Sequence, residues 1–506
     1  MAFEPKYEKV VSGYRENLGT TQVVVDFRLP MNDSVSKVIC ASAKAIVCNV
    51  EGLERTLNYN GFVGFHVIYK NQEGLIEGVN YTAEFKDKYD ANTDLNNTTP
   101  VVKANVVDIT TSLDNGEVKV SAIIELDIDT IKTSEINALV GVSDMVVKQE
   151  DFSYNSFDGL VYDKWEQNHD IEIKDAVKKV LGVDVNTYIE KVVPNDKYLT
   201  LKGGVDVEIC YLTEEDVLRS SSQSFTFSQE IAGDKLQDLS CVQSALYNDI
   251  NDNKITTTID VDSTMVNVVL PMVYNGYVFN LNTIDVVVDA YSLNNFSKFT
   301  TSSIETLGCC DSVSWEEKIN NGLQLDENAP FVDEVLGTCC DNIVVANVTV
   351  NDNVVVEGVA HTTLVYLNKE NKSINSVEIE IPFSSSVDVP YNCEDANALV
   401  SAGIINVVGK ARRGRDLEVT AMLMLYADLY KNKEEGLITQ VSLEDEMPEN
   451  ECAMSFYITK EGDTVWDIAK EMAITTEDLL AQNPDLTDPI PTGTRVVVYR
   501  QRVVQY

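Results

Sequence analysis

The sequence predicts a mainly β, multidomain protein in which three tandem β-rich repeats precede a small β-α-α-β domain. The chain has 506 residues, which is too long for a single hydrophobic core. One pattern of glycine, tyrosine and aliphatic residues returns three times, and around it apolar residues occupy alternate positions, as in half-buried strands. After the third copy, the apolar spacing changes to that of helices.

The net charge of the chain limits the classes of molecule that we expect as its partners. It carries 81 acidic and 39 basic side chains, which gives a net charge of -42. Such a field repels phosphate backbones and anionic lipid headgroups, so we expect neither nucleic acid nor a membrane surface as the main partner. Two interpretations stay open: the charge selects basic protein partners, or it only solvates a crowded surface.

Residues 1–20 are expected to form an N-terminal extension before the first repeat. They contain no apolar run typical of a secretory signal, and no later stretch approaches the roughly 18 apolar residues that a membrane span needs. We therefore expect no membrane insertion and a chain that stays in the cytosol where it is made.

The ten cysteines form no CxxC pair. In a reducing compartment, they are expected to be small buried apolar residues, with no cofactor and no metal. The alternative is a zinc site built from the two Cys-Cys pairs, Cys309-Cys310 and Cys339-Cys340.

The repeat is recognised by a glycine that lies eight residues before a tyrosine: Gly61 and Tyr69, Gly203 and Tyr211, Gly358 and Tyr366. An apolar pair precedes each glycine at one fixed distance: Val38-Ile39, Val180-Leu181 and Val335-Leu336. Such agreement over three gap-free windows indicates true internal repeats. We place the three β repeats at residues 21–150, 155–305 and 310–442.

Turn residues predict hairpins inside the repeats. In the first copy, Asn115-Gly116 supplies the positive φ angles of a tight turn before an alternating apolar run. Gly414 holds the corresponding place in the third copy. In the second copy, an Asn-Gly pair occurs later than expected, at Asn275-Gly276, and the downstream register drifts.

Catalytic motifs do not stand out in the sequence. The three histidines are His66, His169 and His361, and two of them fall inside expected strands. There is no GxSxG elbow, no glycine-rich phosphate loop and no HExxH helix. The residues kept across the copies are of the types that serve backbone geometry and packing, so we expect no enzymatic activity and no catalytic residue.

The C-terminal part begins with an acidic linker at residues 443–452, and residues 453–500 form a separate domain. A short strand and a turn lead to Thr464, which has Asp467 at capping-box spacing. Thr475 and Asp478 repeat this spacing and open a second helix. A valine-rich strand at residues 495–499 completes the β-α-α-β order.

This C-terminal domain resembles a LysM module over its whole length, with the pattern Y-x-x-x-x-G-D-T-x-W-x-I-A at residues 457–469 and Asn483-Pro484 near the end of the second helix. The resemblance implies a shallow groove for N-acetylglucosamine polymers or another partner. Its walls would be Gly462, Asp463 and Thr464 on one side, and Asp485, Leu486 and Ile490 on the other. Lys460 and Trp466 would be exposed anchors. In the alternative, Asp463 and Thr464 only cap the helix and Trp466 only packs.

The three β copies resemble the spore coat-associated (SPOCS) domain, and SPOCS repeats followed by one LysM module resemble the SipL family of spore coat morphogenesis proteins. The resemblance implies a mother-cell protein at the forespore surface. Its LysM module would bind a coat morphogenetic ATPase, and its repeats would bind other coat proteins.

Two functions of different classes therefore remain open. The first is a protein-binding scaffold of the spore coat. The second is a protein that binds peptidoglycan, or another glycan with N-acetylglucosamine, in the cortex or cell wall. A third interpretation, an accessory to a hydrolase, is disfavoured because catalytic motifs are lacking.

Overall fold

The computed structural model confirms a mainly β, multidomain protein that carries two short helices in its C-terminal domain. The structure describes residues 3–30, 34–195, 197–233, 236, 239–250, 255–390, 393, 395–448, 454–487 and 489–499. The side chains of residues 239, 240, 309, 310 and 340 are outside this description. All strand pairs are antiparallel.

The first repeat is built from two three-stranded sheets, with the orders β1-β6-β5 and β2-β3-β4. Alternate residues of both sheets form one shared core, which includes Phe65, Val120 and Ile124. The strands of this repeat are β1 (Glu4–Arg28), β2 (Val35–Leu53), β3 (Thr56–Asn71), β4 (Ile76–Asp90), β5 (Thr99–Asp114) and β6 (Glu117–Ser143).

The other two repeats have the same topology. In the second, β8-β9-β10 form one sheet, and β13 pairs with β7, β11 and β12, so that two short strands replace one. In the third, the sheets are β15-β16-β17 and β14-β19-β18. The bounds are β7 (Val146–Glu172), β8 (Val177–Pro194), β9 (Tyr198–Thr213), β10 (Leu218–Ala232), β11 (Leu239–Asn248), β12 (Thr256–Ile259), β13 (Met265–Tyr291), β14 (Asn295–Gln324), β15 (Val332–Val350), β16 (Asn353–Asn368), β17 (Ile374–Asp388), β18 (Asn397–Arg413) and β19 (Asp416–Glu446).

The strand bounds differ from the boundaries expected from the sequence. Residues 4–20, expected within an N-terminal extension, belong to β1, and residues 443–446 of the expected linker belong to β19. The hydrophobic pattern misses the start of β1 because several of its buried residues are polar or small, as at Ser12, Gly13 and Arg15. The strands divide the body at residues 4–143, 146–291 and 295–446.

The repeated glycines have a steric cause. A Cβ atom at Gly61, Gly203 or Gly358 would overlap the carbonyl oxygen of Ile46, Tyr188 or Val344, respectively. We call the sheets β2-β3-β4, β8-β9-β10 and β15-β16-β17 the meander sheets, because their strands follow one another in the chain. In each repeat this contact lies beside a register shift between the first two strands of the meander sheet. Only glycine lets the backbones approach this closely. The repeated tyrosines Tyr69, Tyr211 and Tyr366 are buried.

Two of the three expected glycine turns are present. Asn115 and Gly116 have positive φ angles of 52° and 86° between β5 and β6, and Gly414 has φ 68° between β18 and β19. The pair Asn275-Gly276 is not a turn but lies inside β13. The ring of Tyr274 lies over Gly276 there, so a glycine is needed for packing.

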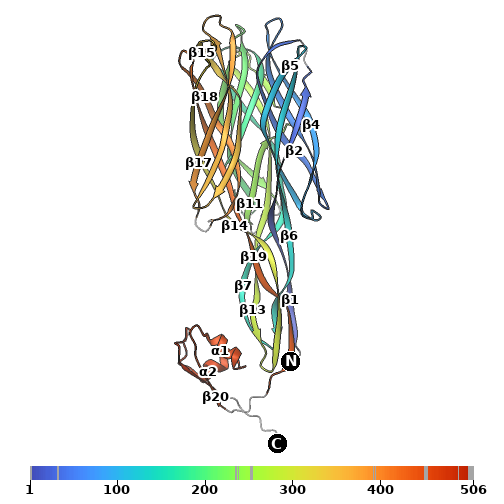
Figure 1. Ribbon diagram of the computed structural model, residues 1–506, viewed down its shortest axis with the longest axis vertical. Helices are drawn as coiled ribbons and strands as arrows, with labels where there is room; N and C mark the ends of the chain where they lie inside the picture. The colour runs from blue at the N-terminus through green and yellow to red at the C-terminus, as the bar shows by residue number, and fades with distance from the viewer. Residues whose placement is uncertain are drawn as a thin grey trace.

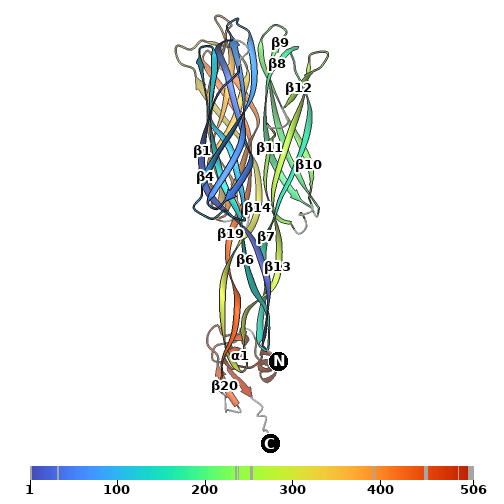
Figure 2. The same ribbon diagram turned by 90° about the vertical axis from the view of Figure 1, so that its right-hand side faces the viewer.

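The three repeats pack into one head around a common axis (Figure 1, Figure 2). The meander sheets contact each other in a closed ring, in which β4 contacts β8, β10 contacts β15, and β17 contacts β2. Lys179 pairs with Glu77 across the first junction, and Arg219 pairs with Glu334 across the second, at 2.6 Å. An apolar cluster from all three repeats fills the axis: Ile39, Cys40, Ile68, Ile76, Leu181, Cys210, Leu212, Leu218, Leu336, Cys339 and Val365.

A stalk extends from one end of the head (Figure 1). It consists of the outer parts of the six long strands β1, β6, β7, β13, β14 and β19, two from each repeat. Apolar residues from all three repeats meet in its interior: Val10, Ala138, Val286, Ile304 and Leu437. The stalk therefore holds the repeats together over a second region.

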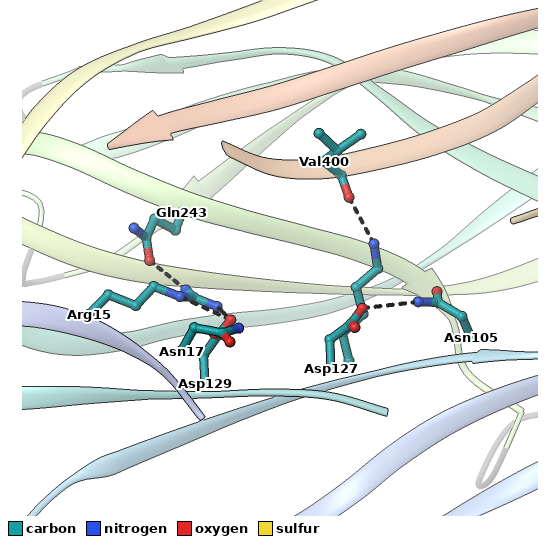
Figure 3. Close-up of polar contacts among 8 residues, drawn as sticks. Arg15, Asn17, Asn105, Asp127, Asp129, Gln243 and Val400 are labelled. Atoms are coloured by element: carbon teal, nitrogen blue, oxygen red, sulfur yellow. Dashed lines mark hydrogen bonds and ion pairs between the residues drawn. The ribbon is translucent and has the colours of Figure 1, made fainter. Parts of the chain in front are cut away.

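A buried cation, Arg15, joins the three repeats. Figure 3 shows its guanidinium between Asp129 of the first repeat and Gln243 of the second. Arg15 is 5% exposed and donates to Asp129 Oδ2 at 2.6 and 3.2 Å and to Gln243 Oε1 at 2.6 Å. Asn432 of the third repeat donates to the Arg15 carbonyl at 2.6 Å. A buried guanidinium needs such partners, because its transfer out of water is costly.

Candidate functional site

The C-terminal domain has the predicted β-α-α-β order. It comprises β20 (Met454–Ile458), α1 (Val465–Glu471), α2 (Thr476–Gln482) and β21 (Arg495–Tyr499), and the two strands pair. Thr464 and Asp467 form the predicted capping box, and Thr475 accepts from the Asp478 backbone N–H at 3.0 Å. The core is small and is made by residues that include Ile468, Leu479 and Val496.

The first expected wall of the groove is a turn at the surface. Gly462 is exposed and has φ 87°, a conformation that glycine adopts without strain. Asp463 accepts a hydrogen bond from the Lys460 backbone N–H at 2.7 Å, and Thr464 caps α1. Both polar residues thus stabilise the turn, as in the alternative interpretation, and both keep partial exposure. The Lys460 ammonium lies 5.7 Å from the Tyr457 ring centre.

The second expected wall is only partly at the surface. Asp485 is exposed, and Leu486 is half-buried against the module's core. Ile490 is 5% exposed and belongs to that core, so the prediction that it lines the surface of the groove is wrong. Sequence reasoning missed the residue that holds this loop. Asn483 donates to the Val497 carbonyl at 2.7 Å and accepts from the Val497 N–H at 2.8 Å.

Trp466 is not a free anchor, because it contacts the end of the stalk. Its Nε1 donates to Asp289 Oδ2 at 2.7 Å, and its ring meets that of Tyr291 edge-on, with 5.1 Å between centroids. Lys470 binds the same carboxylate, with contacts of 2.6 and 2.8 Å. Helix α1 therefore faces the tip of β13.

Tyr291 completes this junction. Its hydroxyl donates to the Ile474 carbonyl at 2.6 Å, and its side chain belongs to the same apolar cluster as Ile468 and Ala469. Burial raises the pKa of Tyr291 to about 12, so the hydroxyl stays a donor. No sequence signal points to Asp289 or Tyr291, because they precede the module by more than 150 residues. The C-terminal domain thus contacts the end of the stalk through α1 and the segment that follows it, while Gly462 and Asp485 stay exposed.

The head contains an arrangement that resembles a catalytic triad. Ser42 Oγ donates to Asp184 at 3.0 Å, and His66 Nδ1 lies 3.6 Å from the same carboxylate. All three side chains are buried at the junction of the first two repeats. A Cβ atom at Gly182 would overlap the His66 ring, so there is no room for a substrate beside it. The geometry is that of a structural contact.

Further titratable groups lie close to this contact. Lys44 donates to the Val185 carbonyl, Ser222 donates to Asp206 at 2.7 Å, and Thr362 donates to Asp341. Burial raises the pKa of Asp206 to about 6 and that of Asp341 to about 7. Burial opposes ionisation of Asp184 too, but His66 and Lys44 hold its pKa at about 2.

The cysteines were expected to be buried apolar residues. Among those whose side chains are described, Cys40, Cys210, Cys241, Cys339 and Cys393 are buried, and Cys48 is exposed. Of the alternative zinc site, the side chains of Cys309, Cys310 and Cys340 lie outside the described part. Elsewhere in the described chain, no three His, Cys, Asp or Glu residues are grouped as metal ligands.

The comparisons with known families agree with the arrangement of a β body and a terminal binding module. Residues 332–410, which run from the start of β15 into β18, match the family described as SipL, SPOCS domain. Residues 457–498 match the LysM domain. The chain thus contains a match to the SPOCS domain followed by a match to the LysM domain. This is the SipL-like architecture that the sequence predicted. No curated protein and no solved structure was found to match.

These two domains support a sporulation-related adaptor role with peptidoglycan binding, and the SipL-like domain suggests association with the spore coat. Over the described ranges, neither helix is long and apolar enough to cross a membrane.

Proposed function

We propose that this protein is a non-enzymatic adaptor of bacterial spore coat assembly. Its LysM module docks a coat morphogenetic ATPase at the forespore surface, and its β repeats engage other coat proteins. The protein acts in the cytoplasm of the mother cell. The SPOCS match in the third repeat supports the link to the coat, and the LysM match supports a recognition module.

The observation that carries the proposal is the placement of the LysM module. The stalk separates it from the head, and contacts to Asp289 and Tyr291 hold it at the stalk's far end (Figure 1). The turn at Gly462 and the loop at Asp485 stay exposed in this position. One molecule can then bind a partner at the stalk end while the head binds another, which is the geometry that an adaptor needs.

The head supports a role without catalysis. The side chains that resemble a triad are buried, and the Ser42 hydroxyl donates to Asp184. A nucleophile needs a base within hydrogen-bond reach and a space for the reacting group. The donation of the Ser42 hydroxyl to Asp184 and the close packing of the His66 ring on Gly182 fit a structural role better than these requirements.

The test uses the purified full-length chain and a purified coat ATPase in a binding assay. Asp485→Arg reverses the charge of the exposed groove wall, and Glu477→Arg makes the same change on the exposed side of α2 as a matched control. We expect Asp485→Arg to weaken capture at least tenfold and Glu477→Arg to bind like the wild type. Equal binding by all three proteins would exclude the groove as the docking site. Failure of the wild type to bind would refute the proposal.

The alternative function is glycan binding, which the LysM match itself favours. The exposed backbone beside Gly462 offers polar groups that acetamido groups can approach closely. Sedimentation of the full-length chain with insoluble peptidoglycan, reversed by chitin oligomers, would support this function. If Asp485→Arg abolishes sedimentation but leaves ATPase capture intact, the groove serves glycan and the ATPase binds elsewhere.

A further inference from the structure

The three junctions of the ring of meander sheets are built from equivalent residues and can be compared directly. The repeated tyrosine of each repeat pairs with one residue on the last strand of its meander sheet, and these residues are Glu77, Arg219 and Asn375. On its other side it pairs with a valine of the first strand, and the residues before these valines are Lys37, Lys179 and Glu334. Each junction brings the last strand of one sheet against the first strand of another, so the expected partners are Glu77 with Lys179, Arg219 with Glu334, and Asn375 with Lys37.

The third junction, between β17 and β2, lacks the ion pair of the other two. An acidic and a basic side chain bind each other at both the first and the second junction. At the third, Asn375 stands where the first junction has Glu77, so it offers Lys37 no charge. Over the described ranges, no carboxylate forms an ion pair with Lys37, and burial and the neighbouring cation Lys70 lower its pKa. The third junction therefore has a cation whose acidic partner is missing.

The third junction is also more open than the others. At the first junction, a Cβ atom on Gly78 would overlap the backbone of β8, and at the second, one on Gly337 would overlap a side chain of β10. A glycine thus lets the strands approach closely at both places. The equivalent residues at the third junction are Ser376 and Cys40, neither of which is a glycine. A cavity of about 260 Å³ lies here, whereas the space at the second junction is about 10 Å³.

The walls of this cavity suit an extended peptide. It is bounded by β2, β5, β16 and β17, and its polar lining includes Thr111, Thr363, Ser376 and Glu378. Among the described strands, β2 pairs only with β3 and β17 only with β16, so both have an unpaired edge. The edge of a sheet presents N–H and C=O groups that a peptide in an extended conformation can pair with. A small anion could neutralise Lys37 but could not pair with a strand edge.

We propose that the cavity at the third junction binds a short acidic segment of a partner protein, which lies extended along β2 and pairs a carboxylate with Lys37. This inference rests on the proposed function, because it names the surface by which the β repeats engage another protein. The carboxylate takes the place that Glu77 holds at the first junction. Glu378 repels a second carboxylate deeper in the cavity, so N–H or hydroxyl groups of the segment face it there.

The net charge of the chain makes this site selective. A charge of -42 repels acidic segments from most of the surface, and it repels a second copy of the chain as a whole. Lys37 and Lys70 lie directly opposite each other on β2 and β3 and are both exposed, so they form a local exception. Reversal of one of these charges should therefore remove most of the attraction.

The test is selection of short random peptides, displayed on phage, on the full-length protein. Phage that bind the Lys37→Glu variant are removed first, so that peptides specific for the LysM module do not accumulate. We expect the remaining peptides to carry Asp or Glu, and Lys37→Glu to weaken a synthetic copy at least tenfold in fluorescence anisotropy. Lys86→Glu reverses the charge of an exposed lysine on β4 and should bind like the wild type.

Ser376→Phe tests the cavity independently of charge. The added ring fills part of the 260 Å³, so the peptide should bind at least tenfold more weakly while the melting temperature does not fall. Unchanged circular dichroism shows that each variant is folded.

Several results would overturn the proposal. They are the absence of any enriched peptide, enrichment of basic or uncharged peptides, and equal binding by Lys37→Glu or Ser376→Phe. Displacement of the peptide by acetate at the same concentration would assign the site to a small anion and would also refute it. No ATPase or glycan is present, so failure here leaves ATPase capture by the LysM module as a separate question.

Discussion

The junction between the LysM module and the stalk offers the sharpest test of how this protein is organised. Asp289→Ala removes the acceptor of two side chains, Trp466 Nε1 and Lys470 Nζ. A hydrogen bond to a charged group contributes about 1.5–3 kcal/mol. The ion pair adds only about 0.2–1 kcal/mol, because the Lys470 and Asp289 side chains are 42% and 30% exposed. We expect a loss of roughly 2 kcal/mol, or about a 30-fold shift toward the undocked module.

Hydrogen–deuterium exchange measures this shift directly. Peptides from the end of β13 and from α1 should exchange faster in Asp289→Ala, while the head peptides keep their wild-type rates. Asp285→Ala is the control, because this exposed aspartate lies on the same strand but stands opposite Asp151 of β7. Unchanged exchange in Asp289→Ala, or an equal change in Asp285→Ala, would show that the contact to Trp466 and Lys470 does not hold the module.

Three further predictions concern the body. Gly203→Ala should destabilise the protein by about 1–3 kcal/mol in chemical denaturation, because its Cβ would overlap the Tyr188 carbonyl, whereas Gly141→Ala has open space and should be neutral. Arg15→Met should cost about 3–5 kcal/mol by leaving Asp129 buried without its cation, and a thermal melt equal to the wild type would contradict this. The melting temperature should rise as the pH falls from about 7 to about 5, because burial raises the pKa of Asp206 to about 6 and of Asp341 to about 7, so the folded state binds more protons than the unfolded one. Asp341→Asn should flatten this dependence, and a melting temperature that falls over the same range would refute the sign.

The closed ring of meander sheets gives the three repeats fixed neighbours. At the first junction, the first repeat contributes the acidic residue Glu77 and the second repeat the basic residue Lys179. At the second junction the charges are reversed, because the second repeat contributes the basic residue Arg219 and the third repeat the acidic residue Glu334. Exposed pairs contribute little to stability, but like charges in a wrong pairing repel. The two pairs therefore favour one order of the repeats around the axis.

The local structure of this protein could be predicted from its amino-acid sequence alone. Apolar residues at alternate positions predicted the strands, and Asn115-Gly116 and Gly414 predicted two turns that the structure contains. Thr464 with Asp467 predicted the start of a helix, which the structure also contains. These features depend on backbone geometry and on neighbours within a few residues. The recurrence of glycine and tyrosine likewise identified the repeats, because each copy must meet the same local packing requirement.

The contacts between these units could not be predicted from the sequence and are visible only in the folded chain. The stalk is held partly by polar buried residues such as Ser12 and Arg15, which hydrophobic periodicity does not detect. The sequence predicts Trp466 as a surface anchor, but in the fold it contacts Asp289 and Tyr291. It also predicts Ile490 as part of the groove wall, but in the fold this residue is buried in the module's core. Long-range contacts of this kind carry no signal in the spacing of residues, because the two partners lie in different elements and only the packing of the whole chain sets their distance.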